Sequence, residues 1–489
     1  MKRLAVTFAL ACACLALAAP AQASVDVGIA DDRPVGAPDG GAAFFALMND
    51  VGLRQVRLTV MWDPAQPATI ENQAEIESLL PVAALRGIRV AFSVMPVRAR
   101  SVTGSPRAAA EFAAFLQLLA QTFPTVKDVV VGNEPNQSRF WQPQFDAGGR
   151  GVAAAAYEAL LARSYDALKA VDPSINVIGV GLSPRGNDNP SAAGNVSASP
   201  VKFLQGLGAA YRASRRRAPI MDELAFHPYP KKDTDPLLLG YHWPNAGVAN
   251  LDRVKQAFWD AFGGTAQKTF EQGLRMNLDE VGWQVAVTPD ALGAYFGVES
   301  VVPTNEWAQA AIYSGLIRYV ACDPSVDSVL FFGLQDEPNL DRWQAGLMRA
   351  DGSPRPSYDA VRAAIAQTSG NCVGRMRSWR HSHTVDGAKA TFPKERRLPV
   401  RVDAWSFLAS AEEDAVFDAG IYRLAGARRA GPALRESGKL EAHVTRFVRF
   451  PARRLRPGRY VYSIRIRAAA NRVRVRRVTS RPLTIFRSR

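Results

Sequence analysis

Two acidic residues stand at or just past the end of short apolar stretches. Glu134 lies in Val129-Val-Val-Gly-Asn-Glu-Pro-Asn136, and Glu280 lies in Met276-Asn-Leu-Asp-Glu-Val-Gly-Trp283. If these stretches are strands on opposite sides of one barrel, their carboxyl groups face each other across a cleft. Facing carboxyl groups are what cleavage of a glycosidic bond requires, because one protonates the leaving oxygen while the other attacks the sugar or activates water.

The sequence around these residues supplies elements that can hold them in place. Short apolar stretches alternate with longer amphipathic or Ala-rich ones, and Gly52, Gly87 and Asp172-Pro173 punctuate the ends of the latter. The predicted strands are 25–30, 55–61, 88–94, 127–132, 176–181, 223–227, 275–281 and 328–333. The predicted helices lie near 42–51, 72–85, 107–122, 152–170, 201–214, 251–262, 305–320 and 358–366.

Eight alternations of strand and helix predict an α/β fold, the (β/α)8 TIM barrel, over residues 24–368. Active sites of this fold lie at the carboxyl ends of the strands, where Glu134 and Glu280 are found. The main alternative is an open doubly wound sheet. That fold needs a Gly-rich loop after the first strand, where this chain has Asp31-Asp32-Arg33-Pro34.

The motifs resemble those of the clan A glycoside hydrolases, including families 5 and 39. Asn133-Glu134-Pro135 on strand four, with a Glu on strand seven, carries the resemblance. It covers about 70% of the chain and implies that Glu134 is the acid/base, Glu280 the nucleophile and Asn133 a ligand of the sugar 2-hydroxyl. Further matching positions, which imply substrate-binding residues near the nucleophile, are Arg57 on strand two and His227 and Tyr229 on strand six.

Two features depart from this pattern. Asp279 stands beside Glu280, so either acid can point inward; Glu280 is preferred because it matches the superfamily and precedes Gly282-Trp283. Strand eight reads Phe331-Phe-Gly-Leu-Gln, without the Trp that serves family 5 as a sugar platform. Because the C–H faces of sugars stack on aromatic rings, Trp283 is predicted to bind substrate instead.

The N-terminus has the features of a secretory signal, which we predict to span residues 1–23. Lys2 and Arg3 precede an apolar stretch that ends in Ala21-Gln22-Ala23. Removing it leaves a secreted chain without a membrane-spanning segment. It also leaves two cysteines, Cys322 and Cys372, for which we predict a structural disulfide. No metal ligand cluster or cofactor motif is evident in the sequence.

The last part of the chain differs in composition. From residue 371 onward, 28 Lys and Arg against nine Asp and Glu give a net charge of +19, whereas the first 370 residues carry −4. We predict a linker over 369–395 and a basic β-sandwich of the immunoglobulin or fibronectin type over 396–489. The strands that we predict in it are 400–407, 417–424, 440–450, 460–467 and 473–478.

This charge has two interpretations. The domain either holds the protein on an anionic cell-wall polymer, or it carries arginines only for solubility. Nucleic-acid binding is not expected, because the sequence has no recognition motif for it. We expect a monomer.

These features together predict a secreted retaining glycoside hydrolase that acts on a β-linked glycan or glycoside, similar to cellulases, mannanases or xylanases. One alternative is a barrel that binds glycans without cleaving them and adheres through its basic domain. A metal-dependent hydrolase is disfavoured, because His227 and His242 are the only histidines of the predicted barrel.

Overall fold

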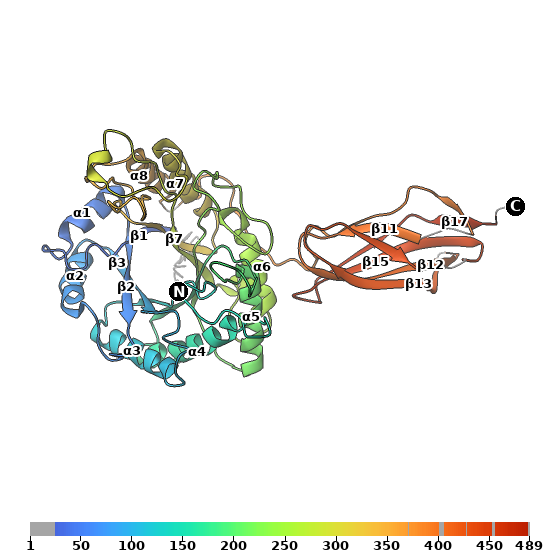
Figure 1. Ribbon diagram of the computed structural model, residues 1–489, viewed down its shortest axis with the longest axis horizontal. Helices are drawn as coiled ribbons and strands as arrows, with labels where there is room; N and C mark the ends of the chain where they lie inside the picture. Colours follow the sequence, from blue (N-terminus) through green and yellow to red (C-terminus); the bar gives the residue numbers. More distant parts are fainter. Residues whose placement is uncertain (1–24, 370, 401–404, 427, 452–454, 488–489) are drawn as a thin grey trace, which may run out of the picture.

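A computed structural model describes residues 25–369, 371–400, 405–426, 428–451 and 455–487. The predicted signal peptide therefore lies outside the described residues. Eight parallel strands close into a barrel in chain order, with β8 pairing back to β1 (Figure 1). They are β1 Asp26–Ala30, β2 Gln55–Trp62, β3 Arg89–Pro96, β4 Asp128–Val131, β5 Asn176–Leu182, β6 Glu223–Phe226, β7 Arg275–Val281 and β8 Val326–Phe332. The predicted TIM barrel is confirmed.

A helix follows each strand, and the helices form a ring around the barrel (Figure 1). They are α1 Ala42–Val51, α2 Gln73–Leu85, α3 Ala108–Thr122, α4 Ala153–Val171, α5 Pro200–Ser214, α6 Leu251–Phe262, α7 Glu306–Val320 and α8 Pro356–Thr368. Short 3-10 helices occupy Val248–Asn250, Phe270–Gln272 and Leu292–Ala294. Among the described helices, none combines the length and apolar character that crossing a membrane requires.

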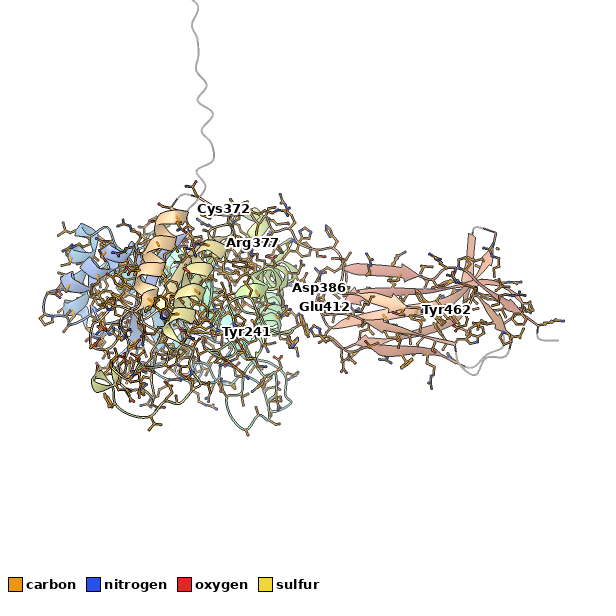
Figure 2. All side chains as sticks on the ribbon, turned by 90° about the horizontal axis from the view of Figure 1, so that it is seen from above. Tyr241, Cys372, Arg377, Asp386, Glu412 and Tyr462 are labelled. Atoms are coloured by element: carbon orange, nitrogen blue, oxygen red, sulfur yellow. A yellow bond between two sulfur atoms is a disulfide. The ribbon has the colours of Figure 1, made fainter. Side chains whose placement is uncertain are left out.

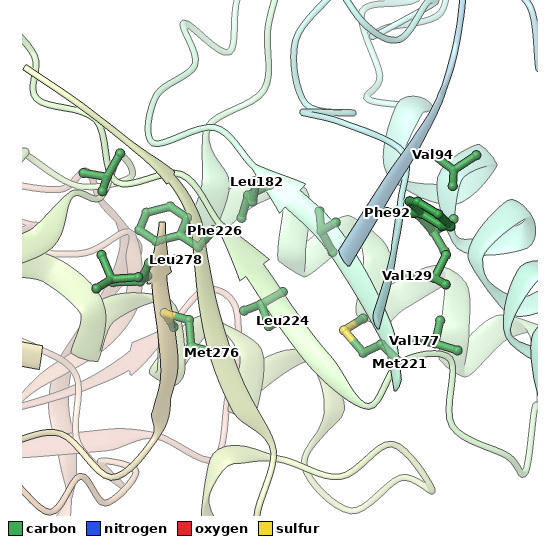
Figure 3. Close-up of a cluster of buried hydrophobic side chains, with 14 of the residues drawn as sticks. Phe92, Val94, Val129, Val177, Leu182, Met221, Leu224, Phe226, Met276 and Leu278 are labelled. Atoms are coloured by element: carbon green, nitrogen blue, oxygen red, sulfur yellow. The ribbon is translucent and has the colours of Figure 1, made fainter. Parts of the chain in front are cut away.

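The strands alternate between two environments, which explains why this sequence closes into a barrel. On β7, Met276 and Leu278 pack into the large apolar core that includes the helices, as Figure 3 shows together with Phe92 and Leu224 of other strands. The alternate residues face inward, where Val130, Ile178 and Ala225 form a separate small cluster. Inward positions near the carboxyl ends are polar, so the closed barrel gathers them at one mouth.

The basic C-terminal region forms two packed β-sheets. Its strands are β9 Lys389–Thr391, β10 Arg397–Pro399, β11 Trp405–Ser410, β12 Ala415–Ala425, β13 Arg428–Leu440, β14 Arg446–Phe450, β15 Gly458–Ala468, β16 Val475–Thr479 and β17 Leu483–Phe486. A six-stranded sheet has the order β10-β17-β15-β12-β13, with β16 also on β15, and a three-stranded sheet has the order β14-β11-β9. Phe407 of the small sheet packs against Tyr462 of the large one within a shared core. This is the predicted sandwich.

Strand prediction in the sandwich was less accurate than in the barrel. The predicted strand 440–450 is wrong, because Leu440 ends β13 and the chain reverses at His443, whose φ is 61°, before β14 begins. Residues 401–404 of the predicted strand 400–407 lie outside the described residues. The prediction missed β13, because its Gly431, Pro432 and Gly438 are residue types typical of turns.

The segment between the barrel and the sandwich, predicted as the linker 369–395, packs on the barrel for much of its length. The indole of Trp259 on α6 stacks on His381 with ring centroids 3.8 Å apart, and Glu271 contacts the same imidazole at 2.7 Å. The last part of the segment contains β9. Figure 2 shows Asp386 and Glu412 at the junction of the two lobes and Cys372 on the barrel. Cys372 is joined to Cys322 by a disulfide.

Candidate active site

Glu134 stands where β4 ends and the backbone turns into the mouth of the barrel. Its φ is 37°, in the left-handed region that a non-glycine residue adopts only when its surroundings impose it. Its amide donates to the carbonyl of Gly181, 2.9 Å away. Just below, the hydroxyl of Tyr157 donates to the carbonyl of Val131 at 2.6 Å and accepts from the amide of Val180 at 2.8 Å. These bonds fix the ends of β4 and β5 relative to each other.

Glu280 owes its orientation to an irregularity of β7. The register between β7 and β8 shifts between Leu278 and Val281, and such a bulge turns successive side chains away from strict alternation. As a result, both Asp279 and Glu280 face polar partners inside the barrel. Both terminal nitrogens of Arg57 donate to Oε1 of Glu280, at 2.7 and 2.6 Å, and the hydroxyl of Tyr229 donates to Oε2 at 3.1 Å.

His227 brings the two glutamates together. Its Nδ1 lies 3.0 Å from Oε1 of Glu134 and 3.6 Å from Oε2 of Glu280. The sum of these distances is an upper limit on the separation of the two oxygens. The two oxygens are therefore no farther apart than the shortest separations found in inverting glycosidases, whose carboxyl groups lie roughly 6.5–9.5 Å apart. Retaining enzymes hold their carboxyl groups about 5–5.5 Å apart.

His227 is held as a cation by its surroundings. Burial alone would lower its pKa, but the charges of Glu280 and Asp279 and the contacts with Asp279 and Glu134 outweigh burial and raise the pKa to about 10. Its Nε2 lies 3.1 Å from Oδ1 of Asp279. Burial would raise the pKa of Asp279, but His227 and Arg57 lower it, so Asp279 is an ionised carboxylate beneath the site.

A cavity of about 1250 Å³ opens over this cluster. Five of the predicted site residues line it: Arg57, Asn133, Glu134, Tyr229 and Glu280. Of the two adjacent acids, Glu280 lines it and Asp279 does not. His227 does not line it either, and its side chain is fully buried. His227 lies behind the two glutamates and contacts both of them, so its predicted contact with substrate stays a prediction.

The prediction that Trp283 binds substrate is not supported by its position. Its side chain is buried, it is not among the residues that line the cavity, and its indole nitrogen donates to the carbonyl of Asp235 at 3.1 Å. The tryptophan that does line the cavity is Trp343, in the loop between β8 and α8. Its ring lies 5.3 Å from that of Tyr229 and 5.4 Å from that of Phe332.

Sequence reasoning missed several other residues of the cavity. They come from loops after β1, β4, β5, β6 and β8, and the charged ones include Asp31, Asp32, Arg33, Arg139, Arg185, Lys231, Lys232, Asp233 and Glu337. The only signal that pointed to them was position, since each follows a predicted strand. Among the described residues, no group of three or more His, Cys, Asp or Glu side chains is arranged to hold a metal ion.

The chain thus forms a closed (β/α)8 barrel with one carboxylate at the end of β4 and another on β7. No family model matches the sequence. The search of curated proteins also finds no match. Solved structures do match. A family 39 glycoside hydrolase from the gut symbiont Bacteroides cellulosilyticus WH2 aligns over 87% of this chain and 81% of its own, with 15% identity and a TM-score of 0.50.

Two further solved structures are similar over most of the chain. A family 39 enzyme from Xanthomonas axonopodis pv. citri aligns over 89% of this chain and 93% of its own, with 14% identity and a TM-score of 0.47. A monomeric β-xylosidase from Caulobacter crescentus CB15 aligns over 88% and 94%, with 16% identity and a TM-score of 0.44. The alignment with the Bacteroides cellulosilyticus enzyme, at a TM-score of 0.50, shows that the chain shares the fold of that family 39 glycoside hydrolase.

Proposed function

We propose that this protein is a secreted retaining glycoside hydrolase that cleaves O-glycosidic bonds of a β-linked glycan or glycoside. One observation carries the proposal: Glu134 and Glu280, on opposite strands of the barrel, line one cavity and contact the same nitrogen of His227. Secretion rests on the predicted signal peptide at 1–23. The carbohydrate substrate follows from the paired carboxyl groups, for which glycosidic bond cleavage is the best-matched chemistry.

The proposed reaction has two steps. In the first, Oε2 of Glu280 attacks the anomeric carbon as the glycosidic C–O bond breaks, and protonated Glu134 gives its proton to the leaving oxygen. In the second, Glu134 takes a proton from water while the water oxygen attacks the anomeric carbon, releasing Glu280 and restoring the proton on Glu134. Oε2 is the attacking oxygen because Oε1 is held by both terminal nitrogens of Arg57.

The neighbours of the glutamates have supporting roles in this scheme. Arg57 compensates the charge of Glu280 before attack, and Tyr229 orients its free oxygen. Burial, followed by the charges of Glu280 and Glu134, raises the pKa of Tyr229 well above its usual value, so its hydroxyl remains a donor. Asn133 lines the cavity next to Glu134, where it can bind a sugar hydroxyl. Trp343 offers an aromatic face for a sugar ring.

Replacing each glutamate tests this proposal. On a panel of aryl β-glycosides and plant or fungal glycans, we expect Glu134→Gln to lower kcat by about 10²- to 10⁴-fold, and Glu280→Gln to lower it at least as much. Glu77→Gln, at an exposed position of α2, is the matched control and retains full activity.

The stereochemistry of the first product, followed by NMR, tests the retaining mechanism separately. A product of inverted configuration would refute the mechanism while leaving hydrolase activity intact. If wild-type protein and Glu280→Gln are equally inert yet bind glycans, the chain is a glycan-binding barrel instead.

The sandwich supports a second proposal, that it binds an acidic polysaccharide. On the outer face of its six-stranded sheet, Arg465 of β15 is the direct cross-strand partner of Arg477 of β16, and Arg435 lies on β13. Like charges directly opposite each other destabilise a sheet. Asp418, on the same face, is paired with Arg467. The remaining cations have no ion pair among the described residues, so a polyanion would find them available.

Cosedimentation of the full chain with polygalacturonate tests this surface. We expect Arg465→Gln/Arg477→Gln to weaken binding about tenfold at low salt and to reduce its salt dependence. The matched control is Arg449→Gln/Arg472→Gln, which removes two exposed cations elsewhere in the sandwich. Equal losses in both double variants would contradict a specific face. Equally strong binding to double-stranded DNA would overturn the assignment to polysaccharide.

A further inference from the structure

The charged residues of the cavity are segregated by side. Arg139 follows β4, Arg185 follows β5, and Lys231 and Lys232 follow β6. These three strands are neighbours in the barrel, so their loops form one continuous wall, called here the cationic wall. Besides Glu134, the one acid of these loops that lines the cavity is Asp233, whose Oδ1 accepts a hydrogen bond from the amide of Gln284 at 2.8 Å.

The opposite side of the cavity is mainly acidic, and its one cation, Arg33, has Nη1 3.7 Å from Oδ2 of Asp31. Asp31 and Asp32 follow β1, and Glu337 follows β8, the strand that pairs with β1 across the closure of the barrel. The first two acids already have partners: the amide of Leu334 donates to Asp31 at 2.9 Å, and the amide of Thr59 donates to Asp32 at 2.6 Å. A ligand in the cavity therefore experiences an electrostatic potential that is positive near the cationic wall and negative near the loops after β1 and β8.

The cations of the cationic wall are not neutralised by the protein. Among the described residues, none of Arg139, Arg185, Lys231 and Lys232 has a carboxylate within ion-pairing distance of its side chain. All four are exposed at the cavity, where a ligand can reach them. Like charges placed together repel each other, so this wall gains electrostatic stability when an anion binds against it.

The loops that carry the cationic wall are tied to one another. Nη1 of Arg185 donates to the carbonyl of Lys231 at 2.9 Å, and the side chain of Gln137 donates to the carbonyl of Arg185. The hydroxyl of Ser138 donates to Oδ1 of Asn195 at 2.8 Å, which joins the loops after β4 and β5 a second time. The backbone that carries these cations is thus held in place before a ligand arrives.

From this arrangement we infer that the leaving-group side of the substrate carries carboxylates, as in a glycan that contains uronic acid units. The inference rests on the proposed function, because it uses Glu134 as the acid that protonates the leaving oxygen. The leaving group then lies toward the β4 side of the cavity, beside Arg139 and Arg185. A planar guanidinium matches a carboxylate with two parallel hydrogen bonds, so Arg139 and Arg185 are its expected partners.

A pair of aryl glycosides that differ only in the leaving group tests this inference. The probes are the 4-nitrophenyl and 3-carboxy-4-nitrophenyl β-glycosides of one sugar that the enzyme hydrolyses. We expect Arg139→Gln/Arg185→Gln to lower the preference for the carboxylated probe, measured as the ratio of the two kcat/KM values, about tenfold at low salt. Because the ratio is compared between proteins, the intrinsic reactivity of each leaving group cancels.

Two further variants separate charge from structure. Arg163→Gln/Lys268→Gln removes two exposed cations outside the cavity and retains the wild-type ratio. Arg185→Lys keeps the charge but cannot form two parallel hydrogen bonds, so it is expected to retain only part of the preference. A ratio that is unchanged in Arg139→Gln/Arg185→Gln, or reduced equally in Arg163→Gln/Lys268→Gln, would overturn the inference while hydrolysis itself proceeds.

A binding measurement tests the inference without catalysis. Calorimetry with Glu280→Gln compares a β-1,4-linked trimer of glucuronate with its neutral trimethyl ester. We expect the acidic trimer to bind more tightly and to lose this advantage when Arg139→Gln/Arg185→Gln is added. Equal affinity for both trimers would contradict an anionic substrate even if the proposed hydrolase activity were confirmed. A preference for the acidic trimer in a protein inactive on every glycoside would instead contradict only the proposed function.

Discussion

At the level of single residues, His227 links the acidic groups of the site, because its two ring nitrogens face three carboxylates. With its pKa raised to about 10, the imidazole is doubly protonated at neutral pH, with Nδ1 beside Glu134 and Nε2 beside Asp279. A buried cation between carboxylates limits their mutual repulsion, which otherwise rises steeply as the groups approach in a low-dielectric site. The arrangement of Glu134 and Glu280 around one ring nitrogen thus depends on a residue that does not line the cavity.

This assignment predicts a titration. In ¹⁵N-resolved NMR spectra, both ring N–H groups of His227 are expected to persist from pH 6 to 9, and one of the two protons to be lost near pH 10 as the imidazolium becomes neutral. A raised folded-state pKa gives stabilisation that is complete below the unfolded value near 6.5 and declines until the pH passes about 10. The wild type should therefore lose stability relative to His227→Gln across that window.

Asp279→Asn provides the control for this titration, because it removes one of the charges that raise the pKa of His227. We expect the pKa of His227 to fall in this variant. The pH range over which its protonation stabilises the fold should then end at a lower pH than in the wild type. A wild-type His227 that titrates near 6.5, or an unchanged titration in Asp279→Asn, would contradict the cationic assignment.

Sequence reasoning located the two candidate reacting residues at one cavity because strand ends fix their position. Glu134 and Glu280 follow or end apolar strands, and a closed barrel has only one mouth at which such ends meet. Trp343 could not be found in this way, because it lies deep in a long loop. In such a loop the residue type does not indicate the direction in which the side chain points. Trp283 directly follows β7, yet its ring turns into the protein.

At the scale of elements, the barrel was predictable and the sandwich only in part. Parallel strands buried on both sides are continuous apolar stretches with clear ends, so β2, β5 and β7 agree with prediction to within one or two residues. A strand of an exposed sheet can tolerate glycine, proline and arginine, as β13 does. The bulge of β7 that turns Glu280 inward could not be predicted from the sequence of β7, because a register shift depends on the partner strand, β8.

The whole molecule is held together across its two domains by a buried ion cluster. The guanidinium of Arg474, in the sandwich, lies 2.9 Å from Asp260 on α6 of the barrel and 2.7 Å from Glu413 at the near end of the sandwich. It also donates to the carbonyl of Thr384 in the connecting segment at 3.0 Å. Its side chain is 3% exposed. Removing it would leave two buried carboxylates without their cation, a change that typically costs about 3–5 kcal/mol.

We therefore predict that Arg474→Met uncouples the domains. Calorimetry of the wild type should show one unfolding transition, because burial of this cluster requires both domains to be folded. In the variant, Asp260 and Glu413, whose pKa values burial already raises, take up protons more readily, so its stability should recover partly at acidic pH. Arg476→Met removes an exposed cation two residues away and should leave the single transition unchanged. A single transition at the wild-type temperature in Arg474→Met would show that other contacts, such as Trp259 on His381, join the domains.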